Sequence, residues 1–170
     1  LAGNTQLTPR PRTSSAIRRY EFNLIGYDLV WGIGGGLDNA SFNIKPLGLQ
    51  FQTGDRIEFN VRRRYDAPGA DFTLFPGSTV AAGDYWWSRA DVSYNGAEAR
   101  AVRFSLNAST GDFYDGRSTE VSGSVRVRRI PHILATLDVS RADVVLSASR
   151  FTANTVRLRG DYAFSPRLNA

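Results

Sequence analysis

Several stretches of the chain alternate between apolar and polar residues with a period of two. From Val121 to Arg128 the odd positions are small or apolar, and the even positions carry serine or arginine. The same alternation runs from Val102 to Thr110 and from Val156 to Phe164. Successive side chains of a β-strand point to opposite faces, so the pattern predicts a sheet with one apolar face and one arginine-bearing face. Such a sheet has either a water-facing outside and a core, or a lipid-facing outside and a wet lumen.

Turn residues divide the chain into about eight expected strands. These are Ile17 to Trp31, Ser41 to Gln52, Arg56 to Tyr65, Asp84 to Tyr94, Glu98 to Thr110, Arg117 to Arg129, Ile133 to Ser140 and Arg150 to Phe164. The segment from Ala142 to Ser149 either extends the seventh strand or forms a loop, and Asp66 to Gly83 is expected to be a long loop. The Asn95-Gly96 pair marks a tight hairpin. The sequence therefore predicts an all-β fold, an antiparallel, hairpin-connected meander without helices.

Composition limits the class of protein and of partner. The chain has 170 residues, the size of one domain, and contains neither Cys nor Met. Without cysteine a disulfide scaffold and a thiolate metal site are excluded. The net charge of +5 is spread among acids and arginines rather than gathered in a basic tail, so no nucleic-acid partner is expected. A start at Leu1 without any methionine indicates a processed or excised piece, in which residues 1–16 are a leader or linker and 17–170 are the sheet.

Residues with typical catalytic or metal-binding spacing are not found in the sequence. His132 is the one histidine and stands beside Pro131, with no carboxylate cluster near it in the sequence. The glycine run at 32–36 is similar to a phosphate loop, but no helical pattern follows to supply the dipole that such loops use. A nucleophile elbow is also missing. We therefore expect no catalytic residue, no metal, no cofactor and no enzymatic activity.

Aromatic residues form the first group of candidate site residues. Tyr85, Trp86 and Trp87 are consecutive near a strand start, and Trp31 lies at the end of another expected strand. Amphipathic rings at strand ends are typical of a membrane-interface girdle. The same rings could form a sugar-stacking platform, or they could belong to the core of a soluble sandwich. All three interpretations are left open by the residues themselves.

Arginines form the second group. The expected polar faces carry Arg62, Arg103, Arg126, Arg128, Arg157 and Arg159. These side chains would either coat a solvated surface or line a lumen in which acids pair with them across strands. A narrow, dry barrel could not hold so many arginines with so few acids. We therefore predict an open, curved sheet or part of a wider, water-filled barrel, with edges near Tyr20 and Tyr162.

Four stretches together resemble one family. They are PLGLQFQTGDRIEFNV at 46–61, GDY at 83–85, GDFYDGR at 111–117 and LRGDYAFSP at 158–166. In this order and spacing they are similar to the uncharacterised outer-membrane β-barrel domain that follows a carbohydrate-binding family 9-like domain in Gram-negative envelope proteins. The family continues into further strands after the last of these stretches, so the resemblance implies an incomplete barrel segment here.

The resemblance favours the lipid-facing interpretation of the sheet. It implies part of a transmembrane β-barrel in the outer membrane of a Gram-negative bacterium. Its partners would be outer-membrane lipid and a glycan-binding domain in the same full-length protein, with a glycan as a candidate ligand and a solute as a candidate cargo. Two alternatives are kept: a soluble β-sandwich that binds carbohydrate, and the barrel of an active outer-membrane transporter.

Overall fold

The protein folds into one large antiparallel sheet. The computed structural model describes residues 1–130, 133–147, 149–165 and 168–169. Its strands are β1 (Ala2–Leu7), β2 (Ile17–Trp31), β3 (Leu37–Phe51), β4 (Arg56–Asp66), β5 (Phe72–Phe75), β6 (Ser78–Val80), β7 (Tyr85–Asn95), β8 (Val102–Phe113), β9 (Gly116–Ile130), β10 (Ile133–Val145), β11 (Arg150–Ser165) and β12 (Leu168–Asn169). The all-β prediction is thus confirmed, and no helix in the described part of the chain is long and apolar enough to cross a membrane.

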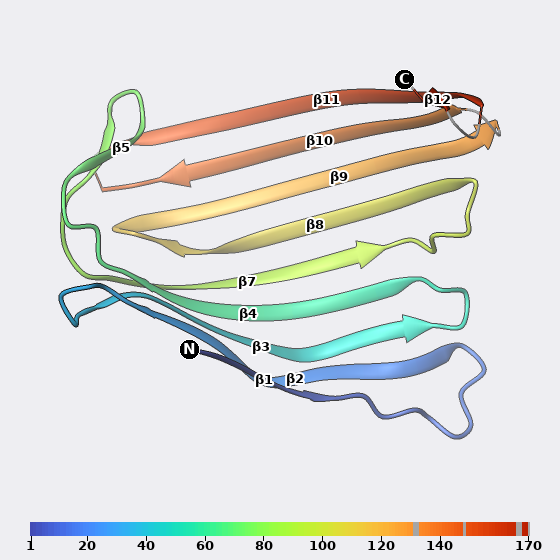
Figure 1. The fold of residues 1–170 in the computed structure, drawn as a ribbon, viewed down its shortest axis with the longest axis horizontal. Coiled ribbons are helices and arrows are strands. Elements are labelled where there is room, and N and C mark those ends of the chain that lie inside the picture. The colour runs from blue at the N-terminus through green and yellow to red at the C-terminus, as the bar shows by residue number, and fades with distance from the viewer. Residues whose placement is uncertain (131–132, 148, 166–167, 170) are drawn as a thin grey trace.

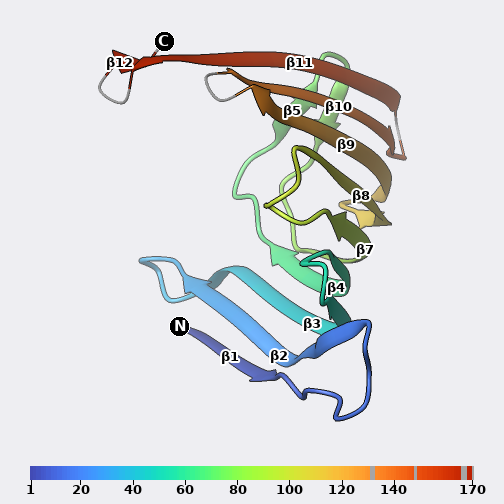
Figure 2. The ribbon, with the colours of Figure 1, turned by 90° about the vertical axis from the view of Figure 1, so that its right-hand side faces the viewer.

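Neighbouring strands follow one another in chain order, as in a meander. The ten-stranded sheet has the order β1-β2-β3-β4-β7-β8-β9-β10-β11-β12, and β5 pairs only with β6. The strands lie side by side along the length of the molecule in Figure 1. Seen from one end, the sheet curves into an open trough, with β1 and β11 well apart at its two margins (Figure 2). The predicted open, curved sheet is confirmed.

Two segments differ from the sequence-based expectation, and a third follows one of the two alternatives that the sequence left open. β1 lies inside the expected leader, and it pairs with β2 from Ala2↔Asp28 to Leu7↔Phe22, so it covers part of the edge expected near Tyr20. Its sequence, AGNTQL, lacks the apolar alternation that identified the other strands. The expected loop after β4 contains the β5–β6 hairpin, and β10 continues through the segment at 142–145 that the sequence left open.

Strand register divides the sheet into two chemically distinct faces. The apolar face carries Leu49, Ile57, Phe59, Val61, Val92, Tyr94, Phe104, Leu106, Ala108, Val121, Val125, Leu137, Val139, Val156 and Leu158. The polar face carries Glu58, Asn60, Arg62, Asp91, Ser93, Ser105, Asn107, Ser122, Ser124, Asp138, Ser140, Thr155 and Arg157. The period-two pattern therefore runs in phase from strand to strand across the sheet.

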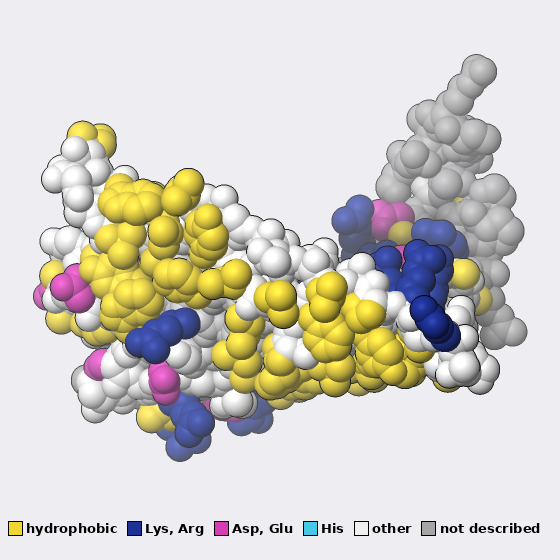
Figure 3. Space-filling model, turned by 90° about the horizontal axis from the view of Figure 1, so that it is seen from below, with side chains coloured by type: hydrophobic (Ala, Val, Ile, Leu, Met, Phe, Trp, Pro, Cys, Tyr) yellow, Lys and Arg dark blue, Asp and Glu magenta, His cyan; other side chains and the backbone are white. Residues whose placement is uncertain are grey.

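Nothing in the described chain covers the apolar face. Leu158 is 78% exposed, Val156 73% and Leu106 59%, and no large side chain among the described residues is fully buried. Seen from below, hydrophobic side chains extend along most of the surface in view (Figure 3). A sheet on which a second layer packed would bury these residues, because burial of apolar area is the main stabilising term of a soluble fold.

The polar face is covered at one end by the β5–β6 hairpin. Val80 packs there with Val144 and Leu146, and Phe72, Leu74, Phe113, Tyr114 and Phe151 surround them. Val144 and Phe113 lie at polar-face positions of β10 and β8. The hairpin lies on the inner side of the curved sheet (Figure 2), so the polar face is the concave one. This cluster is the main apolar core of the described structure, and it is small.

Candidate functional site

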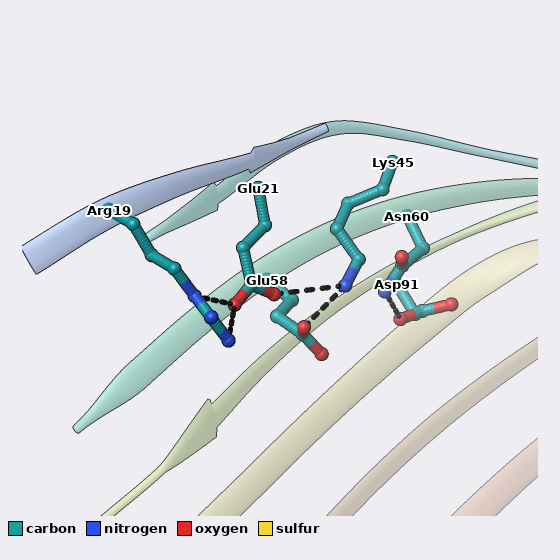
Figure 4. Close-up of polar contacts among 6 residues, drawn as sticks. All are labelled: Arg19, Glu21, Lys45, Glu58, Asn60 and Asp91. Carbon is teal, nitrogen blue, oxygen red and sulfur yellow. Dashed lines mark hydrogen bonds and ion pairs between the residues drawn. The ribbon is translucent and has the colours of Figure 1, made fainter. Parts of the chain in front are cut away.

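The polar face is the candidate functional site, because it is concave and carries both paired acids and unpaired arginines. Over its first half, from β2 to β7, the acids Glu21, Glu58 and Asp91 are each paired with a cation. Arg19 lies 2.8 Å from Glu21, and Lys45 lies between Glu21, at 3.7 Å, and Glu58. These side chains come from three adjacent strands and point toward one another (Figure 4). Glu21 is buried, so its two cationic neighbours offset the cost of removing its charge from water.

A second paired group lies beside the first. The carboxylate of Asp91, on β7, accepts a hydrogen bond from Arg62 Nη2 at 2.7 Å and one from Asn60 Nδ2 at 2.9 Å. Asp91 is 6% exposed, whereas the Arg62 side chain is 45% exposed. The next row holds Arg89, which donates to Ser109 Oγ at 2.8 Å. In this half the named acids all have partners, whereas Asn23 Oδ1 and Arg56 Nε are buried without a hydrogen bond and Arg64 makes no ion pair among the described residues.

Over the second half, from β8 to β11, arginine is in excess. The polar face there holds five arginines and three acids: Arg103, Arg126, Arg128, Arg157 and Arg159, with Glu120, Asp138 and Asp161. Arg103 and Arg126 lie directly opposite each other across β8 and β9. Like charges at opposed positions repel, so this arrangement costs stability unless an anion or water separates them.

The structure places all six predicted arginines on the polar face. Three of them have partners: Arg62 pairs with Asp91, Arg103 pairs with Glu98, and Arg159 lies 2.9 Å from Asp161. Within the described ranges, Arg126, Arg128 and Arg157 make no side-chain hydrogen bond or ion pair. The period-two alternation was enough to assign these residues to one face, but the pairing depends on register and could not be read from it.

The predicted aromatic group is divided between the two faces. Trp86 is 45% exposed on the apolar face, where its ring lies 5.0 Å from that of Tyr65 and the Arg63 guanidinium lies 5.1 Å from the Trp86 ring centroid. Trp31 is on the same face and 51% exposed. Both positions are compatible with an interface girdle or an exposed platform.

Trp87 lies on the opposite face and is 6% exposed. Its ring centroid is 4.7 Å from that of Tyr114, which also contacts Tyr85 at 5.3 Å. A buried ring can form neither a girdle nor a stacking platform, so the interpretation of Tyr85, Trp86 and Trp87 as one unit is wrong for Trp87. Consecutive residues of a strand alternate between faces, and this rule could have separated Trp86 from Trp87 in advance.

Tyr114 anchors the turn between β8 and β9 under the hairpin. Its φ is 50°, in the left-handed region that a bulky residue enters only when packing holds it there. Its hydroxyl donates to Asp66 Oδ2 at 2.9 Å. Burial, followed by this hydrogen bond, raises the pKa of Tyr114 to about 12. The tyrosine therefore remains a neutral donor at physiological pH and ties the turn to the end of β4.

Asp55 is a further organising residue that sequence reasoning missed. It lies in the turn between β3 and β4 and accepts hydrogen bonds from Thr53 Oγ1 at 2.7 Å, Ala97 N at 2.9 Å and Arg100 Nη2 at 2.6 Å. The hydrogen bond from Thr53 is the largest cause that lowers the pKa of Asp55. The Thr-Gly-Asp sequence marks a turn, but its partners at 97 and 100 are brought to it only by the fold.

No arrangement for metal chemistry occurs in the residues that the structure describes, where no group of three or more acidic or histidine side chains is placed to hold a metal ion. His132 lies outside the described residues. No protein-family model matches the chain, and no curated protein or solved structure is significantly similar to it. The function must therefore be argued from the two faces of the sheet.

Proposed function

We propose that this chain forms part of the wall of an outer-membrane β-barrel, with the apolar face toward lipid and the polar face toward a water-filled lumen. The observation that carries the proposal is the uncovered apolar face, which extends in phase over the strands from β3 to β11. Water would make this exposure costly, at about 25 cal/mol per Å² of apolar surface, whereas lipid tails would not.

Strand length supports the same assignment. The strands β2, β3, β4 and β7 to β11 each contain between 11 and 16 residues. A tilted transmembrane strand needs about 9–11 residues to cross the hydrocarbon core. Trp31 lies at the end of β2 and Trp86 near the start of β7, so in this antiparallel sheet both lie near the same end of the sheet on the apolar face, where interfacial aromatic residues are expected.

The polar face supports a wide and hydrated interior. Arg126, Arg128 and Arg157 are exposed and have no ion-pair partner among the described residues, so they require water or a ligand. The barrel would be completed by strands that pair with β1 and with β11. In the described chain, the edge of β11 that faces away from β10 has no strand partner along 152–161. Such strands would come from the same protein or from a second copy.

The biological role proposed for the wall is to anchor a domain and to let a solute pass, rather than to catalyse a reaction. It would hold a glycan-binding domain of the same protein at the outer membrane, in keeping with the resemblance of the 46–61 and 158–166 stretches. Its charged lumen would pass a hydrophilic solute.

Reconstitution tests membrane integration. The protein is refolded in phosphatidylcholine vesicles, floated on a density gradient and washed with alkaline carbonate, which removes peripheral proteins. We expect the protein to remain with the vesicles after the wash and to resist added protease along its strands. Complete release by carbonate, with a folded β-rich protein in the supernatant, would contradict the proposal and favour a soluble sheet.

A further inference from the structure

Two transverse rows of polar residues, small except for Arg157, cross the polar face from β7 to β11. They line a hollow of ≈410 Å³ together with Leu106, Gly123 and Val139. Strand register places Ser93, Asn107, Ser122, Ser140 and Thr155 in one row, and Asn95, Ser105, Ser124, Asp138 and Arg157 in the next. Five strands, from β7 to β11, contribute one residue to each row.

The hydrogen-bonding groups of this hollow are left open by the protein. In the described part of the chain, none of these ten side chains donates or accepts a side-chain hydrogen bond. The contrast with the adjacent row is direct, because Asp91 and Ser109 there accept bonds from Arg62 and Arg89. Rows of short hydroxyl and amide groups, each able to donate and accept, match a ligand that itself carries many hydroxyl groups.

One side of the hollow carries Arg157 beside Asp138, and arginines outnumber acids in the row beyond. Arg157 lines the hollow, and Arg126 lies in the row beyond, opposite Arg103. Arg157 faces Asp138 across the strand pair, yet no ion pair joins them. Guanidinium groups form bidentate hydrogen bonds with carboxylates and phosphates, so an anion at this side would supply a partner to Arg126 and Arg157, while Arg103 keeps its ion pair with Glu98.

The neighbouring hollow is a weaker candidate. It has a volume of ≈210 Å³ and is lined by Arg62, Arg89 and Asp91, whose polar groups already bond within the protein. An incoming anion would have to displace Asp91 from Arg62. The larger hollow requires no such exchange.

We propose that the larger hollow binds a hydroxyl-rich organic anion, of which a carboxylated sugar is the simplest kind. The inference rests on the proposed function, because it assigns the lumen face a class of solute. Hydroxyl groups of the ligand bond to the serine, asparagine and threonine rows, and its carboxylate bonds to Arg157 and Arg126. No aromatic ring lines the hollow, so binding depends on hydrogen bonds and charge and weakens as salt is added.

Binding is measured by calorimetry on the refolded protein in detergent, with trigalacturonate as the probe. Maltotriose is the neutral probe of similar size, and citrate is the anion without sugar hydroxyls. We expect trigalacturonate to bind at least tenfold more tightly than either of them, and 0.5 M NaCl to weaken it by a similar factor. Arg157→Gln should lower the affinity at least tenfold. Arg141→Gln is the matched control, because Arg141 lies on the other face, where its Nε is 2.9 Å from Asp143.

A second variant separates the hydroxyl contribution from the charge. Ser122→Ala combined with Ser124→Ala should weaken trigalacturonate but leave citrate unchanged. Equal affinities for the three probes, no binding of any of them, or equal losses in Arg157→Gln and Arg141→Gln would overturn the inference. Because binding is measured in detergent, carbonate-resistant insertion without binding removes this inference alone. Binding without insertion removes the membrane proposal and keeps the ligand class.

Discussion

The two faces of this sheet satisfy their side chains in different ways. The polar face is concave, pairs its buried acids with cations over β2–β7 and is covered at one end by the β5–β6 hairpin. The apolar face has no such device, and Leu106, Val156 and Leu158 remain more than half exposed. The difference shows that the protein itself supplies partners for many of its polar groups, whereas the environment has to supply those of its apolar groups.

The polar face itself is uneven. Asp91 and Glu21 are buried among cationic partners in the first half, while Arg126 and Arg157 stand in the second half without a partner among the described residues. Paired charges stabilise the sheet, whereas arginines without a partner are available to bind a ligand.

Removal of Trp87 should be the most damaging single change. Trp87→Ala removes the ring that contacts Tyr114 and Phe113 under the hairpin. Loss of a buried Trp side chain lowers the free energy of unfolding by about 3–5 kcal/mol. Trp87→Phe keeps an aromatic ring and should lose less than about 2 kcal/mol. Urea unfolding of the refolded protein, followed by circular dichroism, measures both. Equal losses would show that the ring does not hold the hairpin.

An arginine placed on the apolar face should be the next most costly change. Leu106→Arg would bring a charge into hydrocarbon, and such a change near the bilayer midplane costs about 2–4 kcal/mol. Its neighbour Ser105 lies on the polar face, so Ser105→Arg should cost less than about 1 kcal/mol. Val125→Arg and Leu158→Arg should resemble Leu106→Arg. The unfolding free energies are compared in vesicles, and equal tolerance at Leu106 and Ser105 would remove the distinction between the faces.

Much of this arrangement could be predicted from the sequence. The alternation in β8, β9 and β11 gave the strands and the side of the sheet for each arginine. It could not predict β1, because its AGNTQL sequence has no apolar alternation. It also could not predict the β5–β6 hairpin, which is short and surrounded by proline and glycine. The paired and open halves depend on which residues face one another across strands, and register arises from the whole sheet rather than from any one segment.

Asp91 and Asp138 test the contrast between the two halves of the polar face. Asp91→Asn removes a buried carboxylate that accepts charge-assisted hydrogen bonds from Arg62, so we expect a loss of about 2 kcal/mol. Asp138 has no side-chain partner within the described residues, and Asp138→Asn should change the unfolding free energy by less than about 0.5 kcal/mol. Similar losses at the two positions would mean that pairing does not distinguish the halves.

Acid stability should depend on Asp55. Its pKa is lower in the folded protein than the ordinary value of 3.8, first because Thr53 donates a hydrogen bond to it. The carboxylate therefore stabilises the fold above about pH 4, and this contribution is lost as the pH falls through the folded pKa. Asp55→Asn should flatten the acid limb of the stability profile, measured by urea unfolding between pH 2 and 6. The exposed Asp112 serves as the control, and Asp112→Asn should leave the limb unchanged. A steep limb that persists in Asp55→Asn would contradict the assignment.

The central claim is that the apolar face meets lipid, and the three tryptophans test it most directly. Single-tryptophan variants, made by changing the other two to phenylalanine, are refolded in vesicles of brominated phosphatidylcholine, which quenches indole fluorescence on contact. Trp31 and Trp86 lie half-exposed on the apolar face, and Trp87 is buried on the polar one. We expect strong quenching of Trp31 and Trp86 and little quenching of Trp87. Equal quenching of all three, or none of Trp31 and Trp86, would contradict a lipid-facing wall.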